Sequence, residues 1–442
     1  MKQKIKRMIT IGSMISVMTS SIIPVSASET IGNLNVSKST LAYGGDGNIS
    51  GLDQNIQTTV GKKVITLDKA IEGAIGNSEK LALKSNEIKM YKDKMDLQEK
   101  TNDYYEAIGK KIYDYPYDKL ELQEKQTEQS KAFMEDQIAS DITNKYNDMI
   151  LKEIEINKLK RNLELKKKDL DYMKGKLELG MATSDQVTDT QIEIKSLQDE
   201  IIAKENSLNN NKDYFKVLTD LDLKNTYSLD YNVDYTKFKI DGPVDEYIYD
   251  KIDKYVKYDG EILKLTKDYM KELKDDGIKE IMDKHVEKMP NKSSCVEANA
   301  DGTYSFDSGA YALKLIDYQQ KQQEYYTEIN AYGEYMNGKY SLDEAQVKLN
   351  DTKKNLKNVL KESCSTLLDL ENKIDTLKEQ VNSTNIKLKF AKAQVEMGLM
   401  LQNDYDKQCI ESEEVGTSLR KLIYVHDNLR DSIQKPWILS NQ

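Results

Sequence analysis

The residue types that most often do chemistry in proteins are sparse and scattered in this chain. The sequence has two histidines, His285 and His426, and three cysteines, Cys295, Cys364 and Cys409. Neither histidine has a second ligand at metal-site spacing, and no cysteine lies near a residue that would serve as its catalytic base. The sequence also has no phosphate-binding loop. We therefore predict a protein that is not an enzyme and has no cofactor or metal, with structural or surface roles for both histidines.

One loop partly resembles a calcium site. Glu297, Asn299 and Asp301 place oxygen ligands at alternate positions, and Gly302 follows them. A calcium loop also requires a bidentate glutamate near its end, where this sequence has Ser308. An ordinary turn is therefore the favoured interpretation. The cysteine of this loop, Cys295, is expected to be an accessible thiol.

Three aspartates follow closely after two glycines. Asp185 comes five residues after Gly180, and Asp404 and Asp406 come six and eight residues after Gly398. Carboxylates stabilise the start of a helix, where they accept backbone hydrogen bonds and meet the positive end of the helix dipole. One interpretation is therefore that these aspartates cap helices that begin just after the glycines.

The two glycines occupy equivalent positions in a repeated stretch. Leu170–Val187 aligns without a gap with Leu388–Tyr405, which places Gly180 on Gly398. Apolar residues spaced by seven precede both glycines, and further apolar series follow them, as is typical of long coiled-coil helices. The residues before the glycines are Ile142, Met149, Ile156, Leu163, Leu170 and Leu177, with Leu360, Leu367, Ile374, Val381, Leu388 and Val395. Those after them are Val187, Ile194, Ile201, Leu208 and Phe215, with Val415, Leu419, Leu422, Leu429 and Ile433.

This pattern predicts the architecture. Each copy should be a long helix, a tight glycine turn and an antiparallel return helix. The predicted fold class is mostly all-α: two tandem copies of long antiparallel coiled-coil hairpins, with at most a few short strands at the end away from the tips. The first copy is predicted over residues 66–230 and the second over 231–435, with an insertion near 265–309. Residues 436–442 are predicted to be a tail.

Each copy is also expected to have an interruption between its first helix and its hairpin. In the first copy, a helix over 66–102 and a long helix over 119–179 flank it; in the second, it is placed at 325–340. The first interruption is rich in tyrosine, and its later tyrosines alternate as strand residues would. A membrane-interface belt and a small packed end cap are both open interpretations, and the cap is favoured. These tyrosines are Tyr104, Tyr105, Tyr113, Tyr115 and Tyr117.

The N-terminus predicts export. Residues 1–27 have a basic head, an apolar stretch and a small-residue cleavage site, which is typical of a signal peptide, with a retained membrane anchor as the alternative. Residues 28–65 are predicted to be a flexible lead-in. Without the four basic residues of the head, the formal net charge falls from −10 to −14, which disfavours nucleic-acid binding. Three cysteines do not indicate a disulfide framework.

Taken together, these features resemble the TolC-type outer-membrane efflux proteins. That family opens with a pattern similar to Thr66–Leu81, and its hairpin tips carry a glycine between apolar residues, followed by an acidic residue. The matching tips here are Leu179, Gly180 and Met181, and Met397, Gly398 and Leu399. The resemblance covers residues 66 to 435.

The resemblance implies partners and site residues. In that family three chains close a tunnel of helices, and the tips dock an adaptor protein and a membrane pump. The six tip residues named above are therefore candidate docking residues, although their glycines could also be ordinary turn glycines. Asp404 matches a family position where acidic side chains narrow the tunnel tip, and Asp406 and Asp185 are neighbours of the same kind, so the three are a possible cation-selective gate.

The family's other end is a β-barrel in the outer membrane, and both interruptions are too short for its strands. The resemblance therefore implies the helical part of the family with the barrel reduced or lost. The expected location is the cell envelope or the extracellular space, with the outer membrane only if a barrel is present. Two hypotheses follow: a TolC-like helical conduit that works as a homotrimer in an efflux or export system, and a non-transporting coiled-coil scaffold or spacer of the cell envelope.

Overall fold

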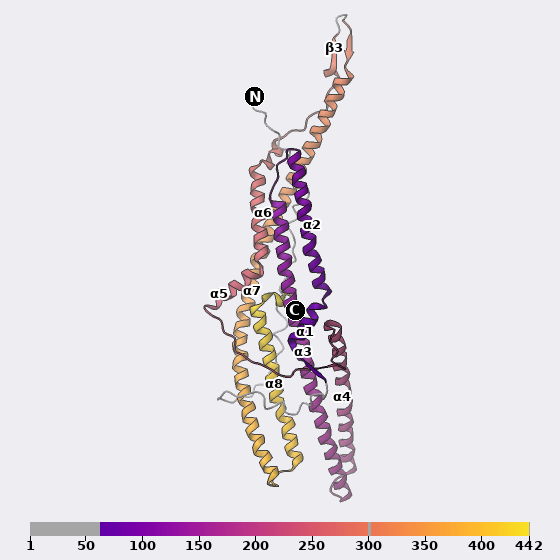
Figure 1. Ribbon diagram of the computed structural model, residues 1–442, viewed down its shortest axis with the longest axis vertical. Coiled ribbons are helices and arrows are strands. Elements are labelled where there is room, and N and C mark those ends of the chain that lie inside the picture. Colours follow the sequence, from indigo (N-terminus) through magenta and orange to yellow (C-terminus); the bar gives the residue numbers. More distant parts are fainter. Residues whose placement is uncertain (1–61, 299–301, 442) are drawn as a thin grey trace. The chain divides into compact units, whose positions relative to one another are not determined.

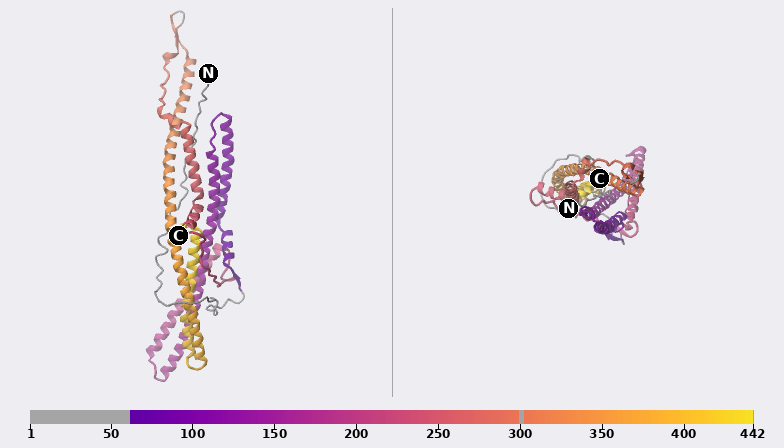
Figure 2. Two further views of the ribbon diagram at one scale, coloured as in Figure 1. Left: turned by 90° about the vertical axis from the view of Figure 1, so that its left-hand side faces the viewer. Right: turned by 90° about the horizontal axis from the view of Figure 1, so that it is seen from above.

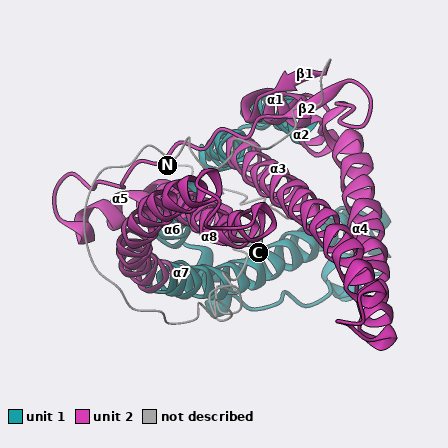
Figure 3. Cartoon of the chain, turned by 90° about the horizontal axis from the view of Figure 1, so that it is seen from below, with its two compact units in different colours: residues 1–24, 84–130, 256–355 teal, residues 25–83, 131–255, 356–442 magenta. Residues whose placement is uncertain are grey.

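The computed structural model describes residues 62–298 and 302–441. The predicted signal peptide and residues 28–61 lie outside this range, as do Asn299 and Asp301 of the loop that partly resembles a calcium site. The chain divides into two compact units (Figure 3). Unit 1 comprises Lys84–Ser130 and Val256–Asn355. Unit 2 comprises residues 62–83, 131–255 and 356–441 of the described chain.

The chain is mostly α-helical, which confirms the predicted fold class (Figure 1). In the described ranges, no helix combines the length and the hydropathy needed to cross a membrane. The part of the chain that the structure describes has four short strands in two pairs, one parallel (β1 with β2) and one antiparallel (β3 with β4). The helices are α1 (Leu67–Gly76), α2 (Glu79–Ala107), α3 (Tyr115–Glu178), α4 (Ser184–Thr219), α5 (Val244–Tyr255), α6 (Lys257–Asp275), α7 (Ser308–Glu396) and α8 (Gln402–Gln434). The strands are β1 (Lys63–Ile65), β2 (Tyr227–Leu229), β3 (Val296–Ala298) and β4 (Tyr304–Phe306), and short 3-10 helices are η2 (Ile278–Asp283), η3 (Lys292–Cys295) and η4 (Pro436–Asn441).

Unit 2 contains both hairpins, one made of α3 and α4 and the other of α7 and α8 (Figures 1 and 2). The heptad residues pack inside them, and the core of the first hairpin also receives α1, β1 and β2. Burial decreases toward the first tip: Ile142, Met149 and Ile156 are buried, whereas Leu177 is exposed. Near a hairpin tip only the two helices of that hairpin are present. The heptad residues there are therefore less completely covered by other side chains than the heptad residues farther from the tip.

The start of the described chain differs from the prediction. Residues 63–65 belong to strand β1 and not to a flexible lead-in, because they pair in parallel with β2. The helix predicted over 66–102 is broken after Gly76, where Asn77 ends α1 and donates a side-chain hydrogen bond to the carbonyl of Val217 (2.9 Å). Both differences arise from contacts with residues that are distant in the sequence. The local sequence pattern does not predict such contacts.

Helix α1 packs closely on the end of α4 at Gly73. A Cβ atom on Gly73 would lie 2.6 Å from the carbonyl oxygen of Thr219. We therefore expect Gly73→Ala to lower the free energy of unfolding by about 1–3 kcal/mol, measured by denaturant titration. Gly76→Ala is the matched control, because its Cβ would meet nothing within 4 Å and alanine is the better helix former. Equal losses in the two variants would contradict this role for the contact.

The segment after β2 crosses to the second hairpin. The backbone N–H of Phe238 donates to Glu371 of α7 (2.7 Å), and Arg420 of α8 donates to the carbonyl of Tyr231 (2.8 Å). His426 is fully buried beneath this segment, with its ring edge-on to Tyr235, so it is packed in the core between this segment and the second hairpin. The other histidine, His285, is exposed.

The C-terminal residues predicted to be a tail are packed. Trp437 of η4 is buried and stacks on Phe133 of α3, with ring centroids 4.1 Å apart. Its indole N–H donates to Asp136 (2.8 Å), and its carbonyl accepts from Gln137 (2.8 Å). Residues 436–441 therefore complete the core of unit 2.

Unit 1 is a layer of four helical segments: α2, the first part of α3, α6 and the first part of α7. Tyr113 and Tyr115 pack on Tyr269 of α6, at centroid distances of 5.4 and 4.1 Å. The prediction of strand-like tyrosines is wrong, because α3 begins at Tyr115 and Pro116 occupies its first turn, where a missing N–H costs nothing. Tyr104, by contrast, is exposed.

The second interruption was predicted at the wrong place. Residues 325–340 are continuous helix within α7 in spite of the turn signal Asn337-Gly338, because no proline occurs among them and Ala331 and Tyr335 are buried at helical spacing. The break lies instead at 276–307, inside the predicted insertion, and holds η2, η3 and the β3–β4 pair. Cys295 was expected to be accessible but is only 5% exposed, because it lies where η3 meets this strand pair.

Candidate docking tips and the seam between the hairpins

Both tips are built by the same backbone motif. At the end of α3, Gly180 has φ +69°, its N–H donates to Leu177, and the next N–H donates back to Lys176. At the end of α7, Gly398 has φ +72°, and the corresponding bonds reach Val395 and Gln394. This is a Schellman motif, in which a residue in the left-handed region ends the helix and satisfies its last carbonyls. Glycine is required there because a Cβ atom disfavours that conformation.

The apolar residues beside these glycines point into solvent. Leu179 and Met181 at the first tip are 76% and 71% exposed, and Met397 and Leu399 at the second are 64% and 74% exposed. Both tips lie at the same end of unit 2 (Figure 2). Each tip therefore exposes one apolar side chain on either side of its glycine.

The return helices begin differently at the two tips. Helix α4 has a capping box, in which Thr183 accepts from the N–H of Gln186 (3.3 Å) and the side chain of Gln186 accepts from the N–H of Thr183 (3.0 Å). Helix α8 begins after Leu401, whose side chain makes no cap hydrogen bond. Asp185 and Asp404 lie in the first turns of these helices, so they meet the positive helix ends without being the capping residues.

Asp406 faces the other hairpin. Its carboxylate accepts from Gln402 (2.6 Å) and lies 3.4 Å from the ammonium of Lys168 on α3. Next to it, Asn403 donates to Asp169 of α3 (2.5 Å). The structure thus brings Asp406 into contact with α3, whereas Asp185 and Asp404 have exposed side chains on their own helices.

These contacts are the lower end of a polar seam between α3 and α8. Arg161 donates to both carboxylate oxygens of Glu413, and Lys158 donates to Glu414 (2.5 Å). The Lys158 bond lowers the pKa of Glu414. Further along, Asn428 donates to Asn144 (2.5 Å) and Lys435 donates to Asp136 (2.7 Å). The seam joins the two hairpins of one chain along much of α8, with basic residues on α3 and acidic residues on α8 near the tips.

Sequence reasoning did not identify the seam. A signal was present: Glu411, Glu413 and Glu414 form an acidic cluster in the second return helix, while Lys158, Arg161 and Lys168 lie in the first long helix. These residues flank the apolar seams, where charged side chains usually face solvent. Their pairing depends on how the two hairpins pack against each other. The spacing of residues within one hairpin does not predict that packing.

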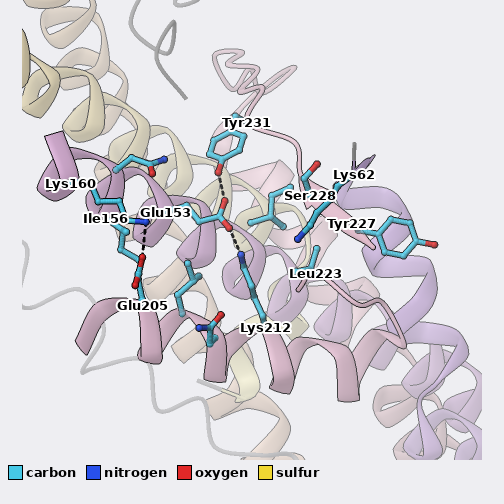
Figure 4. A pocket seen from close by; sticks show the side chains of 14 residues that line it. Lys62, Glu153, Ile156, Lys160, Glu205, Lys212, Leu223, Tyr227, Ser228 and Tyr231 are labelled. Atoms are coloured by element: carbon cyan, nitrogen blue, oxygen red, sulfur yellow. Dashed lines mark hydrogen bonds and ion pairs between the residues drawn. The ribbon is translucent and has the colours of Figure 1, made fainter. Parts of the chain in front are cut away.

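A pocket of about 400 Å³ lies between α3, α4 and the segment around β2 (Figure 4). Glu153 pairs with Lys212 (2.5 Å) and accepts from the hydroxyl of Tyr231, and Lys160 pairs with Glu205 (2.6 Å). These four charged side chains are therefore neutralised within the chain. Among residues 62–298 and 302–441, no group of three or more His, Cys, Asp or Glu side chains could hold a metal ion. Cys295, Cys364 and Cys409 are free thiols.

No model of a known protein family matches the sequence, and no curated protein matches it. Solved structures with the same fold do exist. The CmeC outer membrane channel of Campylobacter jejuni matches 92% of this chain and 94% of its own, with a TM-score of 0.52 and 13% sequence identity. A membrane protein from Pseudomonas aeruginosa matches 83% of this chain and 89% of its own, with a TM-score of 0.52 and 11% identity.

The outer membrane protein VceC of Vibrio cholerae matches 84% of this chain and 96% of its own, with a TM-score of 0.50 and 10% identity. At these identities the likeness concerns the fold. The chain therefore has the fold of CmeC and VceC.

Proposed function

We propose that this protein is a helical conduit component of an envelope-spanning efflux or export system and that it docks partner proteins through its two tips. The observation that carries the proposal is the pair of matched tips. Each is a Schellman turn with exposed apolar residues on both sides of its glycine, and both lie at the same end of unit 2. The fold shared with an outer membrane channel supports the same function.

The proposal includes the partners and the location. Three copies would close the conduit, and an adaptor protein and a membrane pump would dock at Leu179–Met181 and Met397–Leu399. Asp185, Asp404 and Asp406 would narrow the passage near the tips and favour cations, because they are carboxylates at the starts of the two return helices. Export to the envelope would follow cleavage of residues 1–27.

Self-association tests the conduit most directly, because a four-helix layer from one chain cannot surround a passage by itself. We expect light scattering on the purified chain at micromolar concentration to give a multiple of the single-chain mass of 50.7 kDa, less the signal peptide if it is cleaved. Capture of the protein from intact envelopes should also bring down an adaptor or pump. A monodisperse monomer that captures neither would contradict the conduit and favour the envelope scaffold.

A further inference from the structure

Two helices of unit 1 carry apolar residues that the chain leaves uncovered. On α2, Met90, Leu97 and Tyr104 are spaced by seven, and Leu97 is 63% exposed. Leu83 of the same helix continues this spacing and is the last residue before unit 1 begins. On α7, Tyr326, Tyr340 and Val347 follow the same spacing, with Gly333 at the remaining position. Ile329 and Met336 are exposed beside them. We call these sets the α2 stripe and the α7 stripe. Heptad spacing is typical of a helix face that contacts another helix, yet no helix of the described chain covers either stripe.

The stripes lie on the two outer helices of the layer. Helix α2 contacts α3 through Lys92 and Glu124 (3.3 Å), and α3 contacts α6 through Gln126 and Asp259 (2.8 Å). Helix α6 then shares its core with α7, where Tyr335 is buried. The order α2, α3, α6, α7 therefore leaves one flank of α2 and one flank of α7 without a neighbour from the same layer.

We infer that the α2 stripe of one copy packs against the α7 stripe of a second copy of this chain. This interface is heterologous, so it repeats from copy to copy until a ring closes. The inference rests on the proposed function, since it names the surface through which the conduit would assemble.

The two stripes match in direction and in register. Helices α2 and α7 run in opposite directions in unit 1 (Figures 1 and 2), and they keep that relation between copies related by rotation about an axis along the layer. Antiparallel alignment of Leu97 with Gly333 also aligns Met90 with Tyr340 and Tyr104 with Tyr326. Leu83 then meets Val347, so the stripes have equal length.

Gly333 is the most informative position in this register. It is exposed in the interior of a long helix, its φ is not positive, and a Cβ atom there would meet nothing within 4 Å. Glycine is among the weakest helix formers, and neither the backbone conformation nor packing within the chain explains why it occupies this helical position. A leucine from a second copy would fill the space above it.

Charges beside the stripes support the same register. In an antiparallel pair, the positions flanking the apolar residues bring Asp93 beside Lys339 and Lys84 beside Glu344. The same arrangement also brings two carboxylates together, Glu87 and Glu344, each four residues after a stripe residue. There Lys84, whose ammonium lies 2.7 Å from Glu87, offsets the repulsion.

The test is a size swap measured by light scattering and by sedimentation over a concentration series of the full chain. Gly333→Leu would overlap Leu97 of the next copy, so we expect self-association to weaken by about tenfold or more. Leu97→Ala combined with Gly333→Leu exchanges the large and small residues and should restore it. Gly175→Leu on α3 is the matched control, because its Cβ also meets nothing within 4 Å, and it should associate like the unmodified chain. Circular dichroism of each variant checks that its helices are formed.

Self-association that is unchanged in Gly333→Leu, or that the double variant does not restore, would overturn this interface while leaving the conduit proposal intact. An unmodified chain that stays monomeric at micromolar concentration would overturn both.

Discussion

Gly398→Val is expected to abolish partner capture at the second tip while leaving the helices of the chain folded. Gly398 has φ +72°, a conformation that a β-branched residue strongly disfavours. No atom lies within 4 Å of the added Cβ, so the cost arises in the backbone and not from a clash. We expect the turn to lose the hydrogen bonds that Gly398 and Leu399 donate to α7, which would redirect the exposed side chains of Met397 and Leu399.

The measurement pairs envelope capture with thermal unfolding. The backbone strain should lower the free energy of unfolding by about 1–2 kcal/mol, which is too little to unfold long packed helices. Capture of an adaptor or pump should fall, because one of the two docking tips is lost while the first tip is unchanged. Gly175→Val is the matched control: it adds the same bulk near the first tip, but Gly175 is helical and its φ is not positive. If Gly398→Val unfolded the protein or left capture unchanged, the docking role of the tip would be wrong.

Arg161→Glu is expected to separate the two hairpins near their tips. The guanidinium of Arg161 binds both oxygens of Glu413, and the Glu413 side chain is only 17% exposed. The variant removes this bidentate bond and places three carboxylates together, including Glu414. We expect the free energy of unfolding to fall by about 1–3 kcal/mol, because a partly buried carboxylate loses its partner and gains a like charge.

The reversed pair provides the decisive comparison. Arg161→Glu together with Glu413→Arg exchanges the charges and should recover most of the lost stability. Denaturant unfolding measures that recovery, and spin labels on α3 and α8 near the tips measure the separation of the helices. Lys167→Glu is the control on the same helix, since its pair with Glu164 is exposed and contributes little. An equal effect of Arg161→Glu and Lys167→Glu would show that the seam does not hold the hairpins together.

Much of the fold was predictable because its determinants are local. Ile142, Met149 and Ile156 are separated by seven residues, which indicates a helix with one apolar face. All three are buried, as that spacing predicts. Gly180 and Gly398 indicate where the helices end, because glycine adopts the left-handed conformation that closes a Schellman turn. A repeat with one glycine in each copy therefore predicted two hairpins and the location of their tips.

Other features were decided only by the tertiary structure. Strand β1 exists because residues 63–65 meet 227–229, which lie far along the chain. The tail is ordered because Trp437 stacks on Phe133, and Cys295 is buried because η3 meets the β3–β4 pair. Periodicity within one segment contains no information about a partner so distant in sequence.

The candidate site divides in the same way. The sequence by itself determined which residues form the tips and which aspartates follow them, because turn chemistry and helix starts depend on neighbouring residues. Only the tertiary structure decided that Asp406 contacts α3 and that Arg161 meets Glu413, since these contacts depend on the packing of one hairpin on the other. A heptad pattern specifies which face of a helix is buried, but the charged residues beside that face find their partners only after the hairpins have packed.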